Sequence, residues 1–320
     1  MRVAVLGAGL MGHALALVFA LGGHVVRLTD NNPATLEKAG ALMERALATL
    51  RESDDADAAW TSERLRAAVA RVASLADTVR DAELIVEAVY ENPEVKRALY
   101  VEVDALAPRD AIIASNTSRL DIFALAPERR QAQTVIAHWY TPPYLVDLCD
   151  VVGGDRTDPA AVESVRNVVA AMGKVPVTMK RFAPGYIANR IQAAMMLEVH
   201  RLLDGGYATP RDIDDAIIHG LALRMPILGA LAKADFTGLR LLQAELANRS
   251  YEPPQAPTSS AALDSLLAEG RTGVDAGKGY FDWGGRSAEE LLAERDRKLL
   301  ALKRALRTIG PMLGSGPVDT

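Results

Sequence analysis

One stretch near the start of the chain, residues 1–30 (MRVAVLGAGLMGHALALVFALGGHVVRLTD), constrains the possible folds most strongly. A short β-branched run leads into Gly7, Gly9 and Gly12, whose G-x-G-x-x-G spacing falls where a helix begins, and a second strand follows at 25–29. In this spacing the first glycine permits a tight turn, the second removes a Cβ that would block a pyrophosphate, and the third lets helix and strand pack closely. The helix N-terminus also presents free N–H groups to phosphates. The stretch therefore predicts a dinucleotide-binding site.

Asp30, at the end of the second strand, indicates which dinucleotide binds. A carboxylate there accepts hydrogen bonds from the adenosine ribose hydroxyls and repels a 2′-phosphate. The next residues, Asn31, Asn32 and Pro33, include no arginine that could hold such a phosphate, so NAD is expected rather than NADP. An alternative is that Asp30 only caps the helix that begins near Pro33, and the two roles are compatible.

Strands alternate with helices over residues 1–182, which predicts an α/β fold with a Rossmann-type, doubly wound and mostly parallel sheet. Ligands of such sheets bind beyond the carboxyl ends of the strands. Polar residues fall at these ends: Asp30, Glu91, Asn116, Ser118 and His138. The predicted strands are 2–6, 25–29, 72–75, 84–89, 111–114, 134–137, 147–152 and 175–179, and the predicted helices are 33–50, 62–69, 93–107, 159–172 and one beginning at Leu120.

The pattern changes after residue 182, and from there the periodicity is that of helices. The predicted helices are 186–204, 210–218, 221–234, 237–248 and 288–307, with a proline-rich loop at 251–257. We therefore expect a NAD-binding domain at residues 1–182 and an all-α C-terminal domain, for substrate binding and dimerisation, at residues 183–320.

Charge and cysteine content narrow the classes of partner and compartment. A net charge of −5 argues against nucleic acid or an anionic membrane as a general partner, because both require a basic face. The single cysteine, Cys149, cannot form an intrachain disulfide, which suits a reducing compartment. The N-terminus enters the first strand directly, and no apolar run approaches the ~20 residues of a membrane span. A cytoplasmic location is expected.

Several ordered motifs make the chain resemble the L-3-hydroxyacyl-CoA dehydrogenase family, which includes L-gulonate and carnitine dehydrogenases and a lens crystallin. The resemblance extends over nearly the whole chain and is much more specific than the glycine turn alone. The matching motifs are GAGLMG at 7–12, EAVYENPEVK at 87–96, SNTS at 115–118, HWYTPPYLVDLCDVV at 138–152 and APGYIANR at 183–190.

The resemblance implies a role for each matching residue. His138 would be the catalytic base, Asp150 its orienting carboxylate, and Ser118 and Asn189 hydrogen-bond donors near the reacting oxygen. The nicotinamide half of NAD would be lined by Glu91, Lys96 and Asn116. The full set expected to contact NAD is Gly7, Gly9, Leu10, Met11, Gly12, Asp30, Ala88, Glu91, Lys96, Asn116 and Thr141, and no metal ligand is expected.

These residue types suit the oxidation of a secondary alcohol. Such a reaction needs a base for the hydroxyl proton, and histidine titrates near neutral pH. A carboxylate behind the histidine fixes its tautomer and stabilises the imidazolium, and donors at the oxygen lower the barrier of the reverse step. Structural alternatives are a hydrogen-bonded histidine at a strand end for His138, and turn or cap roles for Asn116 and Ser118 ahead of a helix at Leu120. Asn189 lies within a helix, where asparagine is a poor helix former, which favours a functional use.

Three departures from the family pattern bear on the site. Asp150 stands where glutamate is usual and is one methylene shorter, and Thr141 stands where asparagine is common. Asp147 is a second carboxylate near Asp150 in sequence. Its odd separation from Asp150 puts the two on opposite faces of a regular strand, and alignment with the family from His138 selects Asp150 as the partner. Residues 51–57 carry one arginine against four acids, where acyl-CoA members commonly carry lysines. Like charges there disfavour the phosphates of coenzyme A.

The sequence therefore predicts an NAD-dependent dehydrogenase of L-3-hydroxyacyl substrates of the CoA type, with a role in fatty acid metabolism and a homodimer formed through the helical domain. One alternative is a dehydrogenase of a free 3-hydroxy acid, of the gulonate or carnitine type. Another is a NAD-binding structural protein like the crystallin, although Ser118, His138 and Asn189 argue against it. A lysine-dependent 3-hydroxyisobutyrate type fits poorly, since residues 186–202 contain no lysine.

Overall fold

The computed structural model describes residues 1–248 and 259–312, so the loop predicted at 251–257 lies outside the described residues. The chain divides into two compact units, Met1–Asn189 and Arg190–Thr320. The sequence predicts the division at residue 182, before the first long helix, whereas the division by contacts falls just inside that helix.

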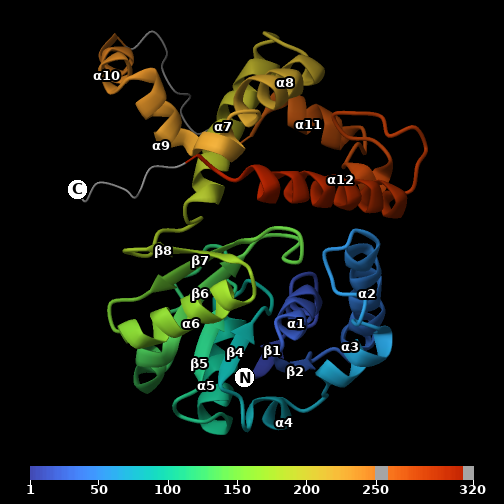
Figure 1. The fold of residues 1–320 in the computed structure, drawn as a ribbon, viewed down its shortest axis with the longest axis vertical. Helices are drawn as coiled ribbons and strands as arrows, with labels where there is room; N and C mark the ends of the chain where they lie inside the picture. Colours follow the sequence, from blue (N-terminus) through green and yellow to red (C-terminus); the bar gives the residue numbers. More distant parts are fainter. Residues whose placement is uncertain (249–258, 313–320) are drawn as a thin grey trace. The chain divides into compact units, whose positions relative to one another are not determined.

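The first unit is built on one eight-stranded sheet with the order β3-β2-β1-β4-β5-β6-β7-β8 (Figure 1). Every neighbouring pair is parallel except β6 and β7, which confirms the predicted doubly wound, mostly parallel sheet. The strands are β1 Arg2–Leu6, β2 Val25–Thr29, β3 Val69–Arg71, β4 Leu84–Glu87, β5 Ile112–Ser115, β6 Thr134–Trp139, β7 Leu148–Gly153 and β8 Val175–Met179.

Helices connect the strands, and several begin at an asparagine or aspartate followed by proline. Asn32, Asn92 and Asp158 each accept backbone N–H groups of the first turn, while the proline after each has no N–H to leave unpaired. The glycine-turn helix packs on β1 and β2, and the last helix of the unit packs on β6, β7 and β8. The helices are α1 Gly12–Leu21, α2 Pro33–Glu52, α3 Ser62–Ala68, α4 Leu75–Val79, α5 Pro93–Leu106, η1 Glu128–Gln133 and α6 Pro159–Ala171.

Two predicted elements of this unit are wrong. The strand predicted at 72–75 lies earlier, at Val69–Arg71, because Ser74 accepts the N–H of Asp77 and thereby begins α4. No helix begins at Leu120 in the described chain. Glu91 accepts the N–H groups of Ser118 and Arg119, and the Thr117 hydroxyl accepts that of Leu120, so side chains hold this segment in a loop.

The second unit is helical, as predicted, with different boundaries. Gly238 (φ 101°) separates two helices where the sequence predicts a continuous one at 237–248, and the helix at 261–268 was not predicted. Among the residues described, no single helix is long and apolar enough to cross a membrane, although the bent pair 210–222 and 225–237 jointly reaches that length and composition. The elements are α7 Ala188–Asp204, α8 Pro210–Ala216, η2 Ile217–Ala222, α9 Met225–Thr237, α10 Leu239–Asn248, α11 Ala261–Ala268, η3 Val274–Ala276 and α12 Ala288–Ile309.

Candidate active site

The glycine turn between β1 and α1 has the geometry that its spacing predicts. Gly7 has φ +93°, and a Cβ there would lie 2.6 Å from the carbonyl oxygen of Ala88. A Cβ on Gly12 would lie 1.7 Å from the carbonyl oxygen of Gly7. A Cβ on Gly9, in contrast, would meet nothing within 4 Å. Gly7 and Gly12 are therefore required by packing inside the protein, while Gly9 keeps free the space that a bound phosphate group would need.

Asp30 is tied to the same turn. Its Oδ2 accepts the backbone N–H of Ala8 (2.7 Å), and its Oδ1 accepts that of Asn32 (2.8 Å). The side chain that caps α2 is Asn32, so the alternative that Asp30 is the helix cap is wrong. Asp30 is half-buried at the carboxyl end of β2, beside the turn where a dinucleotide would lie.

His138 lies at the end of β6 between two other predicted catalytic residues. Its Nδ1 is 3.3 Å from Oδ2 of Asp150, and its Nε2 is 3.4 Å from the hydroxyl of Ser118. The side chain of Asp150 is fully buried and that of His138 is 4% exposed. An ion pair between a protonated histidine and this carboxylate would therefore form away from water, where it is strongest.

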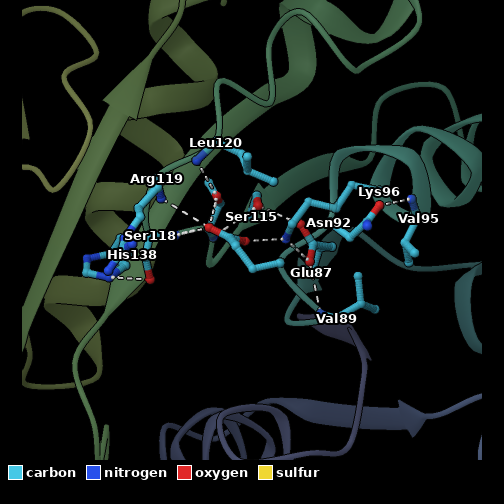
Figure 2. Close-up of polar contacts among 12 residues, drawn as sticks. Glu87, Val89, Asn92, Val95, Lys96, Ser115, Ser118, Arg119, Leu120 and His138 are labelled. Atoms are coloured by element: carbon cyan, nitrogen blue, oxygen red, sulfur yellow. Dashed lines mark hydrogen bonds and ion pairs between the residues drawn. The ribbon is translucent and has the colours of Figure 1, made fainter. Parts of the chain in front are cut away.

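Glu91 fixes the loop that carries Ser118. Its Oε1 accepts the hydroxyl of Thr117 (2.7 Å) and the backbone N–H groups of Ser118 (2.8 Å) and Arg119 (3.1 Å). Burial alone would raise the pKa of Glu91, but the Thr117 hydrogen bond and the charge of Lys96 outweigh it and lower the pKa. Glu91 is thus an ionised clamp on the loop that presents the serine hydroxyl to His138. Figure 2 shows Ser118 beside His138.

Behind Glu91 lies a buried charge that sequence reasoning did not identify, the carboxylate of Glu87. Its side chain is fully buried, and that of Lys96 is 1% exposed. Lys96 Nζ donates to Glu87 Oε1 (2.6 Å) and lies 3.2 Å from Glu91 Oε2, so one ammonium joins the two carboxylates. The other donors to Glu87 are the hydroxyls of Tyr100 (2.8 Å) and Ser115 (2.6 Å) and the N–H of Val89 (2.9 Å).

Two tyrosines flank the imidazole of His138, and neither was assigned a role from sequence. The Tyr186 ring lies 4.5 Å from it at an interplanar angle of 31°, and the Tyr140 ring lies 4.7 Å away at 74°. Tyr186 has φ +50° and donates its hydroxyl to the carbonyl oxygen of Thr117 (2.5 Å). A non-glycine residue in this conformation is held by its surroundings, and here a buried ring packs against a candidate base.

The remaining predicted residues lie around this group. The side chain of Asn116 accepts the N–H of Trp139 (2.8 Å), which joins the ends of β5 and β6. Thr141 donates to the sulfur of Met11 (3.1 Å), so the loop after His138 touches the glycine turn. Leu10 is exposed on that turn. Asn189 is half-buried at the start of α7, and its backbone N–H donates to the Tyr140 hydroxyl.

Two family models match most of the chain. The model described as the NAD-binding domain of 3-hydroxyacyl-CoA dehydrogenase matches residues 2–182, and that of its C-terminal domain matches residues 185–283. The open space at Gly9, the positive φ of Gly7 and the position of Asp30 fit the NAD that this domain binds.

Full-length similarity extends to proteins with different named substrates. The 5-formyl-3-hydroxy-2-methylpyridine 4-carboxylate 5-dehydrogenase of Mesorhizobium japonicum is 30% identical over 95% of this chain and 98% of its own length. An L-carnitine dehydrogenase of Streptomyces coelicolor is 33% identical over 97% of this chain and 96% of its own. A crystal structure of a 5-formyl-3-hydroxy-2-methylpyridine 4-carboxylic acid 5-dehydrogenase, described as an NAD⁺-dependent dismutase, matches with a TM-score of 0.85 and 27% identity over 96% of this chain and 98% of that one.

Proposed function

Because this chain belongs to the 3-hydroxyacyl-CoA dehydrogenase family of NAD-dependent oxidoreductases, we propose that it oxidises a hydroxyl-bearing carbon with His138 as the base. The observation that carries the proposal is the position of one imidazole at the end of β6 between Ser118 (3.4 Å) and Asp150 (3.3 Å). The loop that follows β6 touches the glycine turn through Thr141.

His138, Ser118 and Asp150 each have a separate role in the reaction. Nε2 of His138 takes the hydroxyl proton of the substrate, and the Ser118 hydroxyl beside it hydrogen-bonds the same oxygen. Asp150 holds the proton on Nδ1 and stabilises the imidazolium that forms. Bound NAD supplies the acceptor for the hydride that leaves the carbon.

The proposed substrate is a free hydroxy acid, with a 3-hydroxyacyl-CoA as the alternative. From the family resemblance alone, the CoA thioester is the first expectation. Two observations favour the free acid. Glu52 at the end of α2 and Asp54 and Asp57 after it are exposed, and their charge opposes the phosphates of coenzyme A. The two relatives described above over nearly their full length are named for a pyridine carboxylate and for L-carnitine.

NADH formation with a substrate panel tests the proposal. The panel contains L-3-hydroxybutyryl-CoA, L-3-hydroxybutyrate, L-carnitine and L-gulonate, with D-3-hydroxybutyrate as a stereochemical control. His138→Gln is expected to lower kcat by roughly 10²- to 10⁴-fold on whichever compound is oxidised. Full activity of that variant would overturn the role of the base. NAD binding without oxidation of any compound would favour the structural-protein alternative.

A homodimer formed through the helical unit is part of the proposal. Large apolar side chains are strongly exposed along α9 and its flanks, and burying them against a second copy would be favourable. Sedimentation equilibrium of the whole protein tests the dimer, and a monomer at micromolar concentration would contradict it. The exposed side chains include Leu223 (72%), Leu231 (84%), Phe236 (66%) and Leu239 (59%).

A further inference from the structure

The hydroxyl of Tyr140 and the imidazole of His138 share one oxygen of Asp150. Tyr140 donates to Oδ2 at 2.6 Å, whereas Nδ1 of His138 is 3.3 Å from the same atom. The other oxygen, Oδ1, is buried and has no hydrogen-bond partner within residues 1–248 and 259–312. Tyrosine is therefore the closer partner of the carboxylate, and both donors act on a single oxygen.

Tyr140 is itself held in place. It follows His138 by two residues, so its ring stands beside the imidazole, 4.7 Å away and nearly edge-on. Its hydroxyl accepts the backbone N–H of Asn189 while it donates to Asp150. Burial, followed by the hydrogen bond to Asp150, raises the pKa of Tyr140 far above its ordinary value, so the phenol keeps its proton.

The side chain of Asp150 is short, so its carboxylate needs a second contact that holds its orientation. A fully buried aspartate on β7 faces His138 across the strand pair, and an unanchored carboxylate could rotate about χ2 so that neither oxygen is aligned with Nδ1. A strong donor on Oδ2 removes that freedom, because rotation would break a 2.6 Å hydrogen bond between buried groups.

We propose that Tyr140 is a positioning residue that fixes Oδ2 of Asp150 against Nδ1 of His138 and so compensates for the shorter carboxylate. This inference rests on the proposed role of His138 as the base. It predicts that residues 140 and 150 are coupled in their effect on kcat. Tyrosine with aspartate and phenylalanine with glutamate should both give an active enzyme, and the two mixed combinations should have a lower kcat.

A double-mutant cycle measures this coupling. Tyr140→Phe is expected to lower kcat about 10- to 100-fold, since misplacing a catalytic group by about 1 Å has an effect of that size, with the dissociation constant of NADH unchanged. Asp150→Glu alone should also lower kcat, because the longer side chain overpacks against the Tyr140 hydroxyl. Tyr140→Phe/Asp150→Glu should be at least about tenfold more active than Tyr140→Phe, a strongly non-additive result. Tyr207→Phe, in the exposed part of the helical unit, is the control for loss of a tyrosine hydroxyl.

A second measurement does not depend on knowing the substrate. A solvent-protected Nδ1–H bonded to a carboxylate gives a resolved low-field proton resonance, which His138→Gln assigns by removing it. The resonance should be lost by exchange in Tyr140→Phe and return in Tyr140→Phe/Asp150→Glu, while the thermal melting of each variant shows that it is folded.

The outcomes distinguish the proposed role of His138 as the base from the proposed role of Tyr140 as a positioning residue. If His138→Gln keeps full activity, the proposed base is wrong and the inference falls with it. If His138→Gln is inactive but Tyr140→Phe retains wild-type kcat and the low-field resonance, only the role of Tyr140 is wrong. Purely additive effects in the cycle would also overturn it.

Discussion

His138 on β6 and Asp150 on β7 are directly opposite each other in the one antiparallel pair of the sheet. Cross-strand partners of this kind project to the same face, which is why the two side chains meet. Asp147 precedes β7 and pairs with Lys174 (2.9 Å) instead. The strand pairing therefore selects Asp150 as the neighbour of His138.

The first prediction follows from this pairing. Asp150→Asn should lower kcat by roughly 10²- to 10⁴-fold, the effect of losing the carboxylate behind a histidine base, with NAD affinity nearly unchanged. Asp147→Asn is the matched control and should change kcat little. Steady-state NADH formation and NADH fluorescence titration measure the two effects. The reverse order of the mutants would show that Asp150 is not the functional partner.

The second prediction concerns the cofactor. NAD should be preferred over NADP by at least ~100-fold in kcat/KM, or about 2.7 kcal/mol, because a 2′-phosphate would approach the Asp30 carboxylate. Asp30→Asn removes the charge and leaves one acceptor oxygen for the two N–H groups of Ala8 and Asn32, so the ratio of kcat/KM for NADP to that for NAD should rise. Equal use of both cofactors by the wild type would contradict the prediction.

The third prediction concerns the acidic segment after α2. If its charge opposes coenzyme A, the KM for L-3-hydroxybutyryl-CoA should fall with added salt, while that for free L-3-hydroxybutyrate should change little. Asp54→Asn/Asp55→Asn/Asp57→Asn should lower the acyl-CoA KM by roughly 2- to 10-fold with kcat unchanged. Asparagine suits the positive φ of Asp54 (53°) and can still accept the N–H of Ala59 that Asp57 accepts. No response to salt or substitution would show that the segment does not oppose the CoA substrate.

The fourth prediction concerns the buried charge network. Lys96→Met leaves the Glu87 carboxylate buried without its cation, which should cost about 3–5 kcal/mol of unfolding free energy. Glu87→Gln/Lys96→Met should recover part of that loss, because an amide is much less costly to bury than an unpaired charge. Urea unfolding followed by tryptophan fluorescence measures both.

An exposed ion pair provides the control for this network. Arg66 pairs with Glu44 at 2.5 Å, but their side chains are 62% and 39% exposed. Arg66→Met should therefore change the unfolding free energy by no more than about 1 kcal/mol. Equal losses in Lys96→Met and Arg66→Met would refute a special contribution of the buried pair.

Local signals were sufficient to predict most of the first unit. The glycine spacing and the strand–helix alternation depend on near neighbours in sequence, and the parallel sheet follows from them. The pairing of His138 with Asp150 was expected from the family resemblance. The errors came from competing hydrogen bonds. Ser74 begins a helix where Val72 suggested a strand, and the side chains of Glu91 and Thr117 hold residues 118–120 in a loop where a helix was predicted.

The structure brings together His138, Asp150 and Ser118, which were named from sequence, but the groups that support them were not predictable. Glu87 lies at the end of an apolar strand, and a charge in such a run is a signal for a buried, paired group. Its partners come from α5 and β5, which no local pattern reveals. Tyr140 and Tyr186 lie within recognised motifs, but their contacts with Asp150 and Thr117 depend on the tertiary fold.

Because β6 and β7 pair with each other, the number of residues in the loop that connects them matters for function. Surface connections usually tolerate insertions and deletions. Here a shift of the pairing by one residue would turn Asp150 to the opposite face of the sheet and disconnect it from His138. Lys174 fastens the connection by donating to the carbonyl oxygen of Pro143 (2.8 Å) and to Asp147 (2.9 Å), which opposes such slippage. Outside Tyr140 and Thr141, substitutions in this segment should thus be accepted far more readily than any change in its residue count.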